Sequence, residues 1–441
     1  MDDRASEPLI RAQARKCVLA ATLGCGLEFY DFLTFAFFAI QIGQSFFPSH
    51  SPYLSLMGSL ATFAAGFAGR PLGAWILGGY GDRAGRKPAM MLSMTLMGAG
   101  IALLALTPSY AAIGIAAPLL AILARFIQGF ALGGEVGSAT VFMVEAGGIG
   151  RRGASASYQG VCQGIAVTLG SLVGLGLSLG LTDKQLVEFG WRIAMLLGVS
   201  IVPIALLMRR SLPETQGTPE PECTDDRPGP SYRQIVALGL VIIGAGTIGT
   251  YIGNYIATFG QTQLKMSVSQ SMTGQLASNL MVIFASLAAG PLSDRFGRRP
   301  VMILPTLAMV ILIVPIFSWI VSVRSVGVLV IGGMVVSLLL NASNGPLYAA
   351  IAESLPPRVR SRGFAMIYSL PVAFLGGTTQ LFVTWLLHVT GNPMAIAWYL
   401  SGITLIGLIA MILLPESAPA KRGWNPDPPL ALQASAGVSA A

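Results

Sequence analysis

Two acids interrupt the first of several apolar runs that are 18 or more residues long. Glu28 and Asp31 stand three residues apart, so on a helix their carboxyl groups share a face. An ionised acid at the centre of a bilayer costs on the order of 2.5–3.5 kcal/mol unless it is protonated, paired or facing water. The two acids therefore predict either an ion pair with an arginine of a neighbouring helix or a site that takes up and releases a proton.

Arginines and a further acid stand in other apolar runs. Arg70 precedes a proline in the second run, and Arg125 and Glu135 lie in the fourth. A guanidinium group stays charged, so it can pair with a buried acid or with a carboxylate ligand. Arg70 could serve Glu28, Asp31 or a ligand, and the sequence leaves this choice open. The candidate proton-coupling residues are Glu28, Asp31, Arg125 and Glu135.

Uncharged polar side chains form stripes in several other runs. Gln159 and Gln163 are spaced i, i+4, which permits either hydrogen bonds between helices or the lining of an aqueous path. The second half carries amides and tyrosines but almost no charge within its apolar runs, and His388 is predicted to be interfacial. The candidate ligand-binding residues are Arg70, Arg125, Tyr30, Gln159, Gln163, Tyr251, Asn341, Asn344 and Tyr348, with Arg192 as a further carboxylate-binding candidate.

The elements that position these residues are transmembrane helices. The chain is 54% hydrophobic and only 10% charged, which excludes a soluble globular protein. Runs of this length indicate helices rather than barrel strands. The sequence predicts an all-α integral membrane protein with twelve spans, at approximately 17–40, 54–80, 89–106, 113–144, 154–177, 190–208, 234–257, 271–292, 300–320, 326–352, 363–388 and 394–414.

The positive charge of the chain indicates topology rather than nucleic-acid binding. The net charge is +8, but the 27 Lys and Arg residues are scattered over short loops, mostly on one side of the predicted membrane. Because cytoplasmic loops carry an excess of Lys and Arg, both termini are predicted to be cytoplasmic, in a bacterial inner membrane. Residues 1–16 lack the apolar core of a cleaved signal peptide. The four cysteines imply no disulfide framework.

A repeated loop indicates that the chain consists of two similar halves. Residues 78–87 (GGYGDRAGRK) have a second copy at residues 290–299 (GPLSDRFGRR), and Glu145 and Glu353 precede matching basic segments. The predicted organisation is a cytoplasmic tail at 1–16, a six-helix bundle at 17–210, a cytoplasmic linker at 211–233, a second six-helix bundle at 234–414 and a cytoplasmic tail at 415–441.

The sequence carries no pattern expected of an enzyme. It contains no metal-ligand spacing, no nucleophile elbow and no phosphate-binding glycine loop. Its glycine-rich runs lie within apolar helices, where small residues let helices approach closely. No cofactor and no ATP-binding domain are predicted, so uphill movement of a solute would draw on an ion gradient.

Several motifs resemble those of a known transporter superfamily. The two loop copies and Arg125-Phe126-Ile127-Gln128-Gly129 resemble signatures of the major facilitator superfamily. Within it, four segments are similar to the metabolite–proton symporter family, and to its branch of citrate–proton symporters and tricarballylate transporters. These segments are residues 28–32 (EFYDF), 69–73 (GRPLG), 128–135 (QGFALGGE) and 190–193 (GWRI).

This resemblance implies two six-helix bundles that rock around a central cavity. It places a proton-linked site at Glu28, Asp31 and Arg125. It also implies a charged cluster that holds an inner gate closed, formed in the first half by Asp82, Arg86 and Glu145. The first loop copy departs from the family pattern at Tyr80 and Gly81. The implied gating residues of both halves are Asp82, Arg86, Glu145, Asp294, Arg298 and Glu353.

The resulting hypothesis is proton-coupled uptake of an organic anion, a di- or tricarboxylate such as citrate, by a monomer in the lipid bilayer. The proton is the coupling ion, and neither cofactor nor nucleic acid takes part. The alternatives are an aromatic carboxylate or a zwitterionic osmolyte as substrate, export instead of uptake, and a ligand sensor that moves nothing. A carrier of osmolytes is expected to have a long heptad-bearing C-terminal extension, which residues 418–441 lack.

Overall fold

A computed structural model describes residues 29–84, 86–133, 151–210, 231–355 and 360–418, and within these ranges all regular structure is helical. In the first half, residues 29–37 are helical. The helices that follow are α2 (Ala39–Phe46), α3 (Pro52–Ala84), α4 (Arg86–Leu106), α5 (Tyr110–Ile113), α6 (Ala116–Gly133), α8 (Arg152–Gly180), α9 (Asp183–Gln185), the π-helical η2 (Leu186–Gly190) and α10 (Trp191–Arg210).

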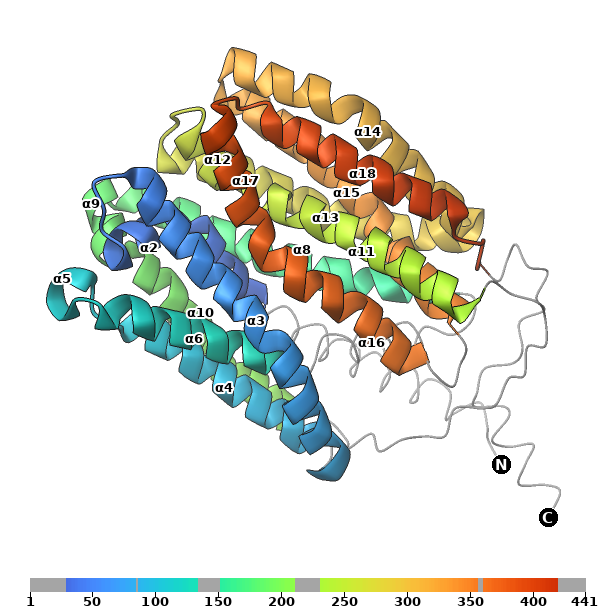
Figure 1. Ribbon diagram of the computed structural model, residues 1–441, viewed down its shortest axis with the longest axis horizontal. Helices are drawn as coiled ribbons and strands as arrows, with labels where there is room; N and C mark the ends of the chain where they lie inside the picture. The colour runs from blue at the N-terminus through green and yellow to red at the C-terminus, as the bar shows by residue number, and fades with distance from the viewer. Residues whose placement is uncertain (1–28, 85, 134–150, 211–230, 356–359, 419–441) are drawn as a thin grey trace, which may run out of the picture.

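The second half is helical as well (Figure 1). Its helices are α11 (Tyr232–Gly253), α12 (Ile256–Thr262), α13 (Val268–Phe296), α14 (Arg298–Val323), α15 (Val326–Ser354), α16 (Arg360–Pro371), the π-helical η4 (Val372–Gly376), α17 (Gly377–Thr390) and α18 (Ala395–Leu413). Within the described ranges, each predicted span is mostly helical. Within the described ranges, nine helices are long and apolar enough to cross a membrane.

Besides the turn at Phe38 that separates residues 29–37 from α2 in the span at 17–40, three predicted spans are interrupted rather than continuous. In the span at 113–144, Gly114 adopts a left-handed φ of 59° that ends α5 before α6 begins. In the span at 363–388, five residues adopt a π-helix between α16 and α17. In the span at 234–257, the helix breaks after Gly253 and resumes at Ile256. Periodicity alone could not show these breaks, because the apolar pattern continues through them.

A glutamine of another helix stabilises the third break. Gln275 of α13 accepts a hydrogen bond from the backbone N–H of Ala257 at 3.2 Å and donates one to the carbonyl oxygen of Gly253 at 3.2 Å. Backbone groups freed inside a membrane protein need such partners, because no bulk water reaches them. The interruption is therefore a built feature of the second half.

Glycines bring the backbones of α3 and α6 into direct contact. A methyl group at Gly129 would clash with the carbonyl oxygen of Gly66, and one at Gly133 would clash with that of Arg70. The packing role predicted for the glycines of α6 is thus confirmed at these two positions. The contact also fixes the backbone of Arg70 against the helix that carries Arg125.

The two halves meet where α8 packs along α13 (Figure 1). Near the middle of α13, Asn279 donates hydrogen bonds to the carbonyl oxygen of Val167 at 3.0 Å and to the hydroxyl of Ser171 at 3.3 Å. A second contact joins α3 to α17. There the ring of Tyr53 stacks on that of His388, with centroids 3.8 Å apart and planes inclined by 11°. His388 lies exposed in the last turn of α17, in agreement with its predicted place at a helix end.

Candidate functional site

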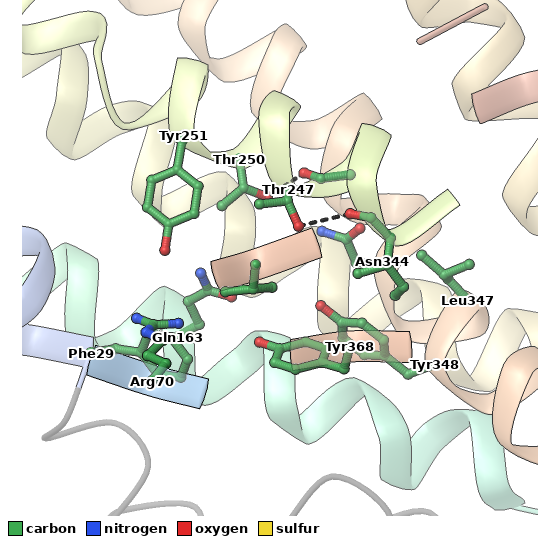
Figure 2. Close-up of a pocket in the computed structure, with 13 residues that line it drawn as sticks. Phe29, Arg70, Gln163, Thr247, Thr250, Tyr251, Asn344, Leu347, Tyr348 and Tyr368 are labelled. Atoms are coloured by element: carbon green, nitrogen blue, oxygen red, sulfur yellow. Dashed lines mark hydrogen bonds between the residues drawn. The ribbon is translucent and has the colours of Figure 1, made fainter. Parts of the chain in front are cut away.

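A cavity with about 450 Å³ of empty space, part of it open to solvent, lies between the halves. Five of the predicted ligand-binding residues line it from four helices: Arg70, Gln163, Tyr251, Asn344 and Tyr348. Figure 2 shows the Tyr251 hydroxyl pointing toward the guanidinium group of Arg70. The cavity therefore combines one cation from the first half with hydroxyl and amide groups, most of them from the second.

Arg70 is the one charged side chain among the described residues that line the cavity. Its Cζ lies 4.2 Å from the ring centroid of Phe67 and 4.7 Å from that of Phe32. Aromatic faces attract a guanidinium group and hold its plane in place. Arg70 is only 8% exposed, so an anion that reached it would meet a cation that is partly stripped of water.

Other lining residues had not been predicted from the sequence. Thr250 of α11 and Tyr368 of α16 line the cavity, together with Phe29. Tyr368 could have been predicted, because its phenol is a polar group within the apolar run 363–388. Thr250 gave no such signal, because a threonine in an apolar helix often bonds its own backbone, and here its hydroxyl does donate to the Gly246 carbonyl at 2.9 Å.

Asp31 and Arg125 form a buried ion pair beside the cavity. Arg125 Nη1 lies 3.7 Å from Asp31 Oδ2, and both side chains are fully buried. The same Nη1 donates a hydrogen bond to Gln128 Oε1 at 2.5 Å, as the i, i+3 spacing in the sequence allows. Within the described part of the chain, neither carboxyl oxygen of Asp31 accepts a hydrogen bond. Buried charges with few hydrogen bonds are costly, so this pair is held at a cost in stability.

One aromatic ring contacts both arginines. The Cζ atoms of Arg125 and Arg70 lie 4.2 Å and 4.7 Å from the centroid of Phe32. Arg125 lies also over Phe35, at 4.5 Å. Phe32 thus connects the cation that lines the cavity with the buried ion pair. The sequence did not single out this residue.

The remaining candidates lie elsewhere. The hydroxyl of Tyr30 donates to the carbonyl oxygen of Ala194 at 3.0 Å, so Tyr30 binds α10 instead of lining a cavity. Gln159 is buried in α8 and lines neither cavity described here. Arg192 donates to the carbonyl oxygens of Ala105 and Thr107, which places it at the end of α4 and away from a ligand. Glu28, Glu135 and Glu145 lie outside the described residues.

A second cavity adjoins the first. Gln163 and Thr250 line both of them, and Asn341 lines the second. The other residues that line the second cavity are Val167, Gly249, Gly253, Asn254, Asn279, Val282, Ser337 and Leu340. None of these described residues is charged, so the second cavity offers only neutral hydrogen-bonding groups.

Comparison with known proteins identifies the family. A family described as "Sugar (and other) transporter" matches residues 16–216, and the family "Major Facilitator Superfamily" matches residues 234–436. A citrate-proton symporter of Salmonella typhi is 34% identical over 410 residues, which cover 92% of this chain and 94% of the relative. The chain belongs to the major facilitator superfamily. It is therefore a multi-pass membrane transporter and not an enzyme.

Further relatives of this transporter differ in their named substrates. A proline/betaine transporter of Escherichia coli (strain K12) is 30% identical over 426 residues, which cover 92% of this chain and 84% of the relative. Among solved structures, that of a D-xylose-proton symporter has a TM-score of 0.70 at 16% identity and covers 92% of this chain and 98% of that one. This last likeness shows the fold and nothing about the substrate.

The second loop copy of the transporter joins the two halves at one end of α8. The Asp294 carboxylate accepts hydrogen bonds from the backbone N–H groups of Gly153 and Ala154, each at 2.9 Å. These donors belong to the first turn of α8, where free N–H groups and the helix dipole favour an anion. Asp294 thus caps a helix of the other half.

Arg298 links this aspartate to a glutamate of its own half. Its Nη1 donates to Asp294 at 2.6 Å, and its Nη2 and Nε donate to the two carboxyl oxygens of Glu353 at 2.9 and 3.2 Å. The structure therefore brings together the three gating candidates of the second half. In the first half, Asp82 and Arg86 lie at the end of α3 and the start of α4, and their side chains lie outside the described residues.

Proposed function

We propose that this transporter couples the uptake of an organic anion, a di- or tricarboxylate such as citrate, to the entry of protons. The observation that carries the proposal is Arg70, the cation that faces a cavity otherwise lined by hydroxyl, amide and apolar groups. A guanidinium group binds a carboxylate through two parallel hydrogen bonds. The identity to citrate-proton symporters, 34% and 35% in two cases, supports the same substrate class.

Electrostatics explains why such an anion requires protons. Moving a negative charge into a cell whose interior is negative costs about 2.3 kcal/mol per charge per 100 mV. Each co-transported proton offsets one such charge. Among the described residues, Asp31 is the acid that we assign to carry the proton. It lies buried beside the cavity, and Arg125 is its only charged neighbour among these residues. Glu28 and Glu135 remain candidates for the same role.

Transport would proceed by rocking of the two six-helix bundles, residues 17–210 and 234–414, about the central cavity. We place both termini, and the cluster of Asp294, Arg298 and Glu353, on the cytoplasmic side of a bacterial inner membrane. In this arrangement the cluster, with its first-half counterpart of Asp82, Arg86 and Glu145, holds the inner side closed. The transporter would act as a monomer.

Uptake of labelled citrate into proteoliposomes tests the proposal. With an inward proton gradient, citrate should accumulate above its external concentration, and a protonophore should abolish the excess. Substitution of Arg70 by glutamine should remove uptake, whereas substitution of Arg192, which binds the end of α4, by lysine should leave substrate affinity unchanged. Accumulation that persists after the gradient is collapsed would contradict the coupling.

A zwitterion is the second candidate substrate, and one observation favours it. Tyr251, Tyr348 and Tyr368 all line the cavity that holds Arg70. Aromatic faces bind quaternary ammonium groups, so the three rings could hold the cationic end of a betaine while Arg70 binds its carboxylate. Competition decides between the two: excess glycine betaine should leave citrate uptake unchanged if the site is built for polycarboxylates. Counterflow of labelled citrate excludes a sensor that binds without transport.

A further inference from the structure

The second cavity is lined by an asparagine whose amide nitrogen has no hydrogen-bond partner among the described residues. Asn254 lies between α11 and α12, is 5% exposed and lines this cavity. Within the part of the chain that the structure describes, its Nδ2 has no hydrogen-bond partner. A buried donor without a partner costs about 1–3 kcal/mol, and an acceptor on a bound molecule would remove this cost.

The neighbouring amides are already engaged. Asn279 Nδ2 donates to the carbonyl oxygen of Val167, and Asn341 Nδ2 donates to that of Ser337 at 2.9 Å. The amide oxygens of these two residues accept bonds from Gln275 and Asn344. Both therefore maintain the cavity wall. Asn254 differs from them because its donor is uncommitted.

The helix break does not need the Asn254 side chain. Gln275 satisfies the freed carbonyl of Gly253 and the freed N–H of Ala257. An asparagine often caps a helix end through its side chain, but here that task has been taken over by another helix. Asn254 thus lines a cavity beside the break while its amide nitrogen makes no contribution to the hydrogen bonds that stabilise the break among the described residues.

We propose that the second cavity is a subsite that binds an uncharged oxygen-bearing group of the substrate, a hydroxyl or a protonated carboxyl, through Asn254. This inference rests on the proposed function, in which an ionised carboxylate of the same substrate binds Arg70. Gln163 and Thr250 line both cavities, so one molecule can reach the two subsites. The group is uncharged because the described lining residues of the second cavity offer no cation to balance a second carboxylate.

The two subsites together predict which substrates the transporter binds. Arg70 selects for one ionised carboxylate, and Asn254 selects for a hydrogen-bond acceptor several atoms away. A site whose buried polar groups are paired by the substrate rejects analogues that lack the matching group. The substrate class is therefore a hydroxy-carboxylate or a partly protonated polycarboxylate.

Calorimetric titration of the purified full-length transporter with citrate tests this subsite. Asn254→Leu should weaken citrate binding at least tenfold, equivalent to about 1.4 kcal/mol. Asn254→Asp keeps the size but loses both N–H donors, and should weaken it at least as much. Asn254→Ser restores a hydroxyl donor and should stay within threefold of the parent. Asn392→Leu, the matched control in an exposed turn, should bind as the parent does.

Tricarballylate lacks the hydroxyl of citrate. Comparing the two ligands therefore shows whether the hydroxyl or a carboxyl of citrate binds Asn254. If the hydroxyl binds Asn254, Asn254→Leu weakens only citrate binding; if a carboxyl does, it weakens both. Unchanged binding of both ligands by Asn254→Leu and Asn254→Asp, with binding lost in Arg70→Gln, overturns the subsite and leaves the proposed function intact. Binding of neither ligand by folded parent protein overturns both. Thermal unfolding checks the fold of each variant. If Asn254→Leu does not fold, citrate binding by Asn254→Asp and Asn254→Ser provides the test.

Discussion

Arg125 Nη1 lies 3.7 Å from the carboxylate of Asp31, and no part of either side chain is exposed. The distance is longer than that of a hydrogen-bonded pair, and Gln128 occupies the closer position on the guanidinium group. The attraction between the two charges is thus present without the hydrogen bonds that commonly accompany it. If Asp31 carries the coupled proton, as proposed above, this pair is the contact that protonation would weaken.

The first prediction concerns this pair. Asp31→Asn removes the titratable group but keeps its shape, so exchange of labelled citrate for unlabelled citrate should continue while accumulation driven by a pH gradient is lost. Arg125→Leu leaves a carboxylate buried without its partner and should lower the free energy of unfolding by about 3–5 kcal/mol. Counterflow and gradient-driven uptake are measured on the same proteoliposomes. Equal loss of exchange, accumulation and stability in Asp31→Asn would assign the pair a purely structural role.

The second prediction concerns Phe32, whose ring contacts both arginines. Phe32→Leu should remove cation–π contacts worth about 0.5–2 kcal/mol and loosen the link between the cavity and the ion pair. Citrate affinity should fall and its dependence on pH should flatten. Two controls separate the contacts, because Phe67 contacts Arg70 and Phe35 contacts Arg125. Phe67→Leu should lower affinity alone, and the hypothesis fails if Phe35→Leu reproduces the whole effect of Phe32→Leu.

The third prediction concerns the contact of Asp294 with the first turn of α8. Asp294→Asn removes the charge that binds the N–H groups of Gly153 and Ala154. The start of α8 and the end of α13 should separate more often, which pulsed electron paramagnetic resonance can detect as a longer distance between spin labels at the exposed positions 158 and 292. Glu353→Gln weakens the Arg298 contact within the second half and serves as the control. An unchanged distance distribution in Asp294→Asn would show that this capping does not hold the halves together.

The fourth prediction concerns the dependence of stability on pH. Glu416 follows α18 and accepts hydrogen bonds from the backbone N–H groups of Arg298, Arg299 and Ala418 at 2.9–3.0 Å. Burial raises the pKa of this carboxyl, but the backbone N–H groups outweigh burial and hold the pKa below its ordinary value of 4.5. The ionised form therefore stabilises the fold fully above pH 4.5, and this contribution disappears as the pH falls through the lower folded-state pKa.

Glu416→Gln tests this linkage. The variant should unfold at a lower temperature than the parent near neutral pH, and the difference should shrink as the pH falls below 4.5. Thermal unfolding followed by intrinsic fluorescence across this range gives the comparison. A difference between parent and variant that stays constant with pH would show that the carboxylate charge is not what stabilises this turn.

Much of the fold follows from patterns in the sequence, and the candidate site follows from it in part. The apolar runs predicted the helices, the family resemblance of the repeated loop implied the cluster of Asp294, Arg298 and Glu353, and polar residues within apolar runs predicted five lining residues of the first cavity. In each case the signal lies within one helix or one repeat. Such local signals survive without knowledge of how the helices pack.

Contacts between helices were not predictable in the same way. The sequence left Asp31 with two possible arginine partners, and only the packing of α6 against residues 29–37 selects Arg125. It gave no sign that Gln275 would satisfy a break in another helix, nor that the hydroxyl of Tyr30 would bind α10. These choices depend on which side chains meet in space. A single sequence does not show directly which side chains of different helices are in contact.

The glycine contact between α3 and α6 constrains how transport and proton movement can be linked. Because no side chain separates these backbones at Gly129 and Gly133, we expect the helices that carry Arg70 and Arg125 to move together. A rocking motion of the first half would move both arginines together and leave the spacing between them unchanged. What can change is their surroundings, as residues of the second half approach or withdraw from Arg70. The coupling would then operate through a change of dielectric and hydrogen-bonding partners around a rigid pair of charges, not through a change in the distance between them.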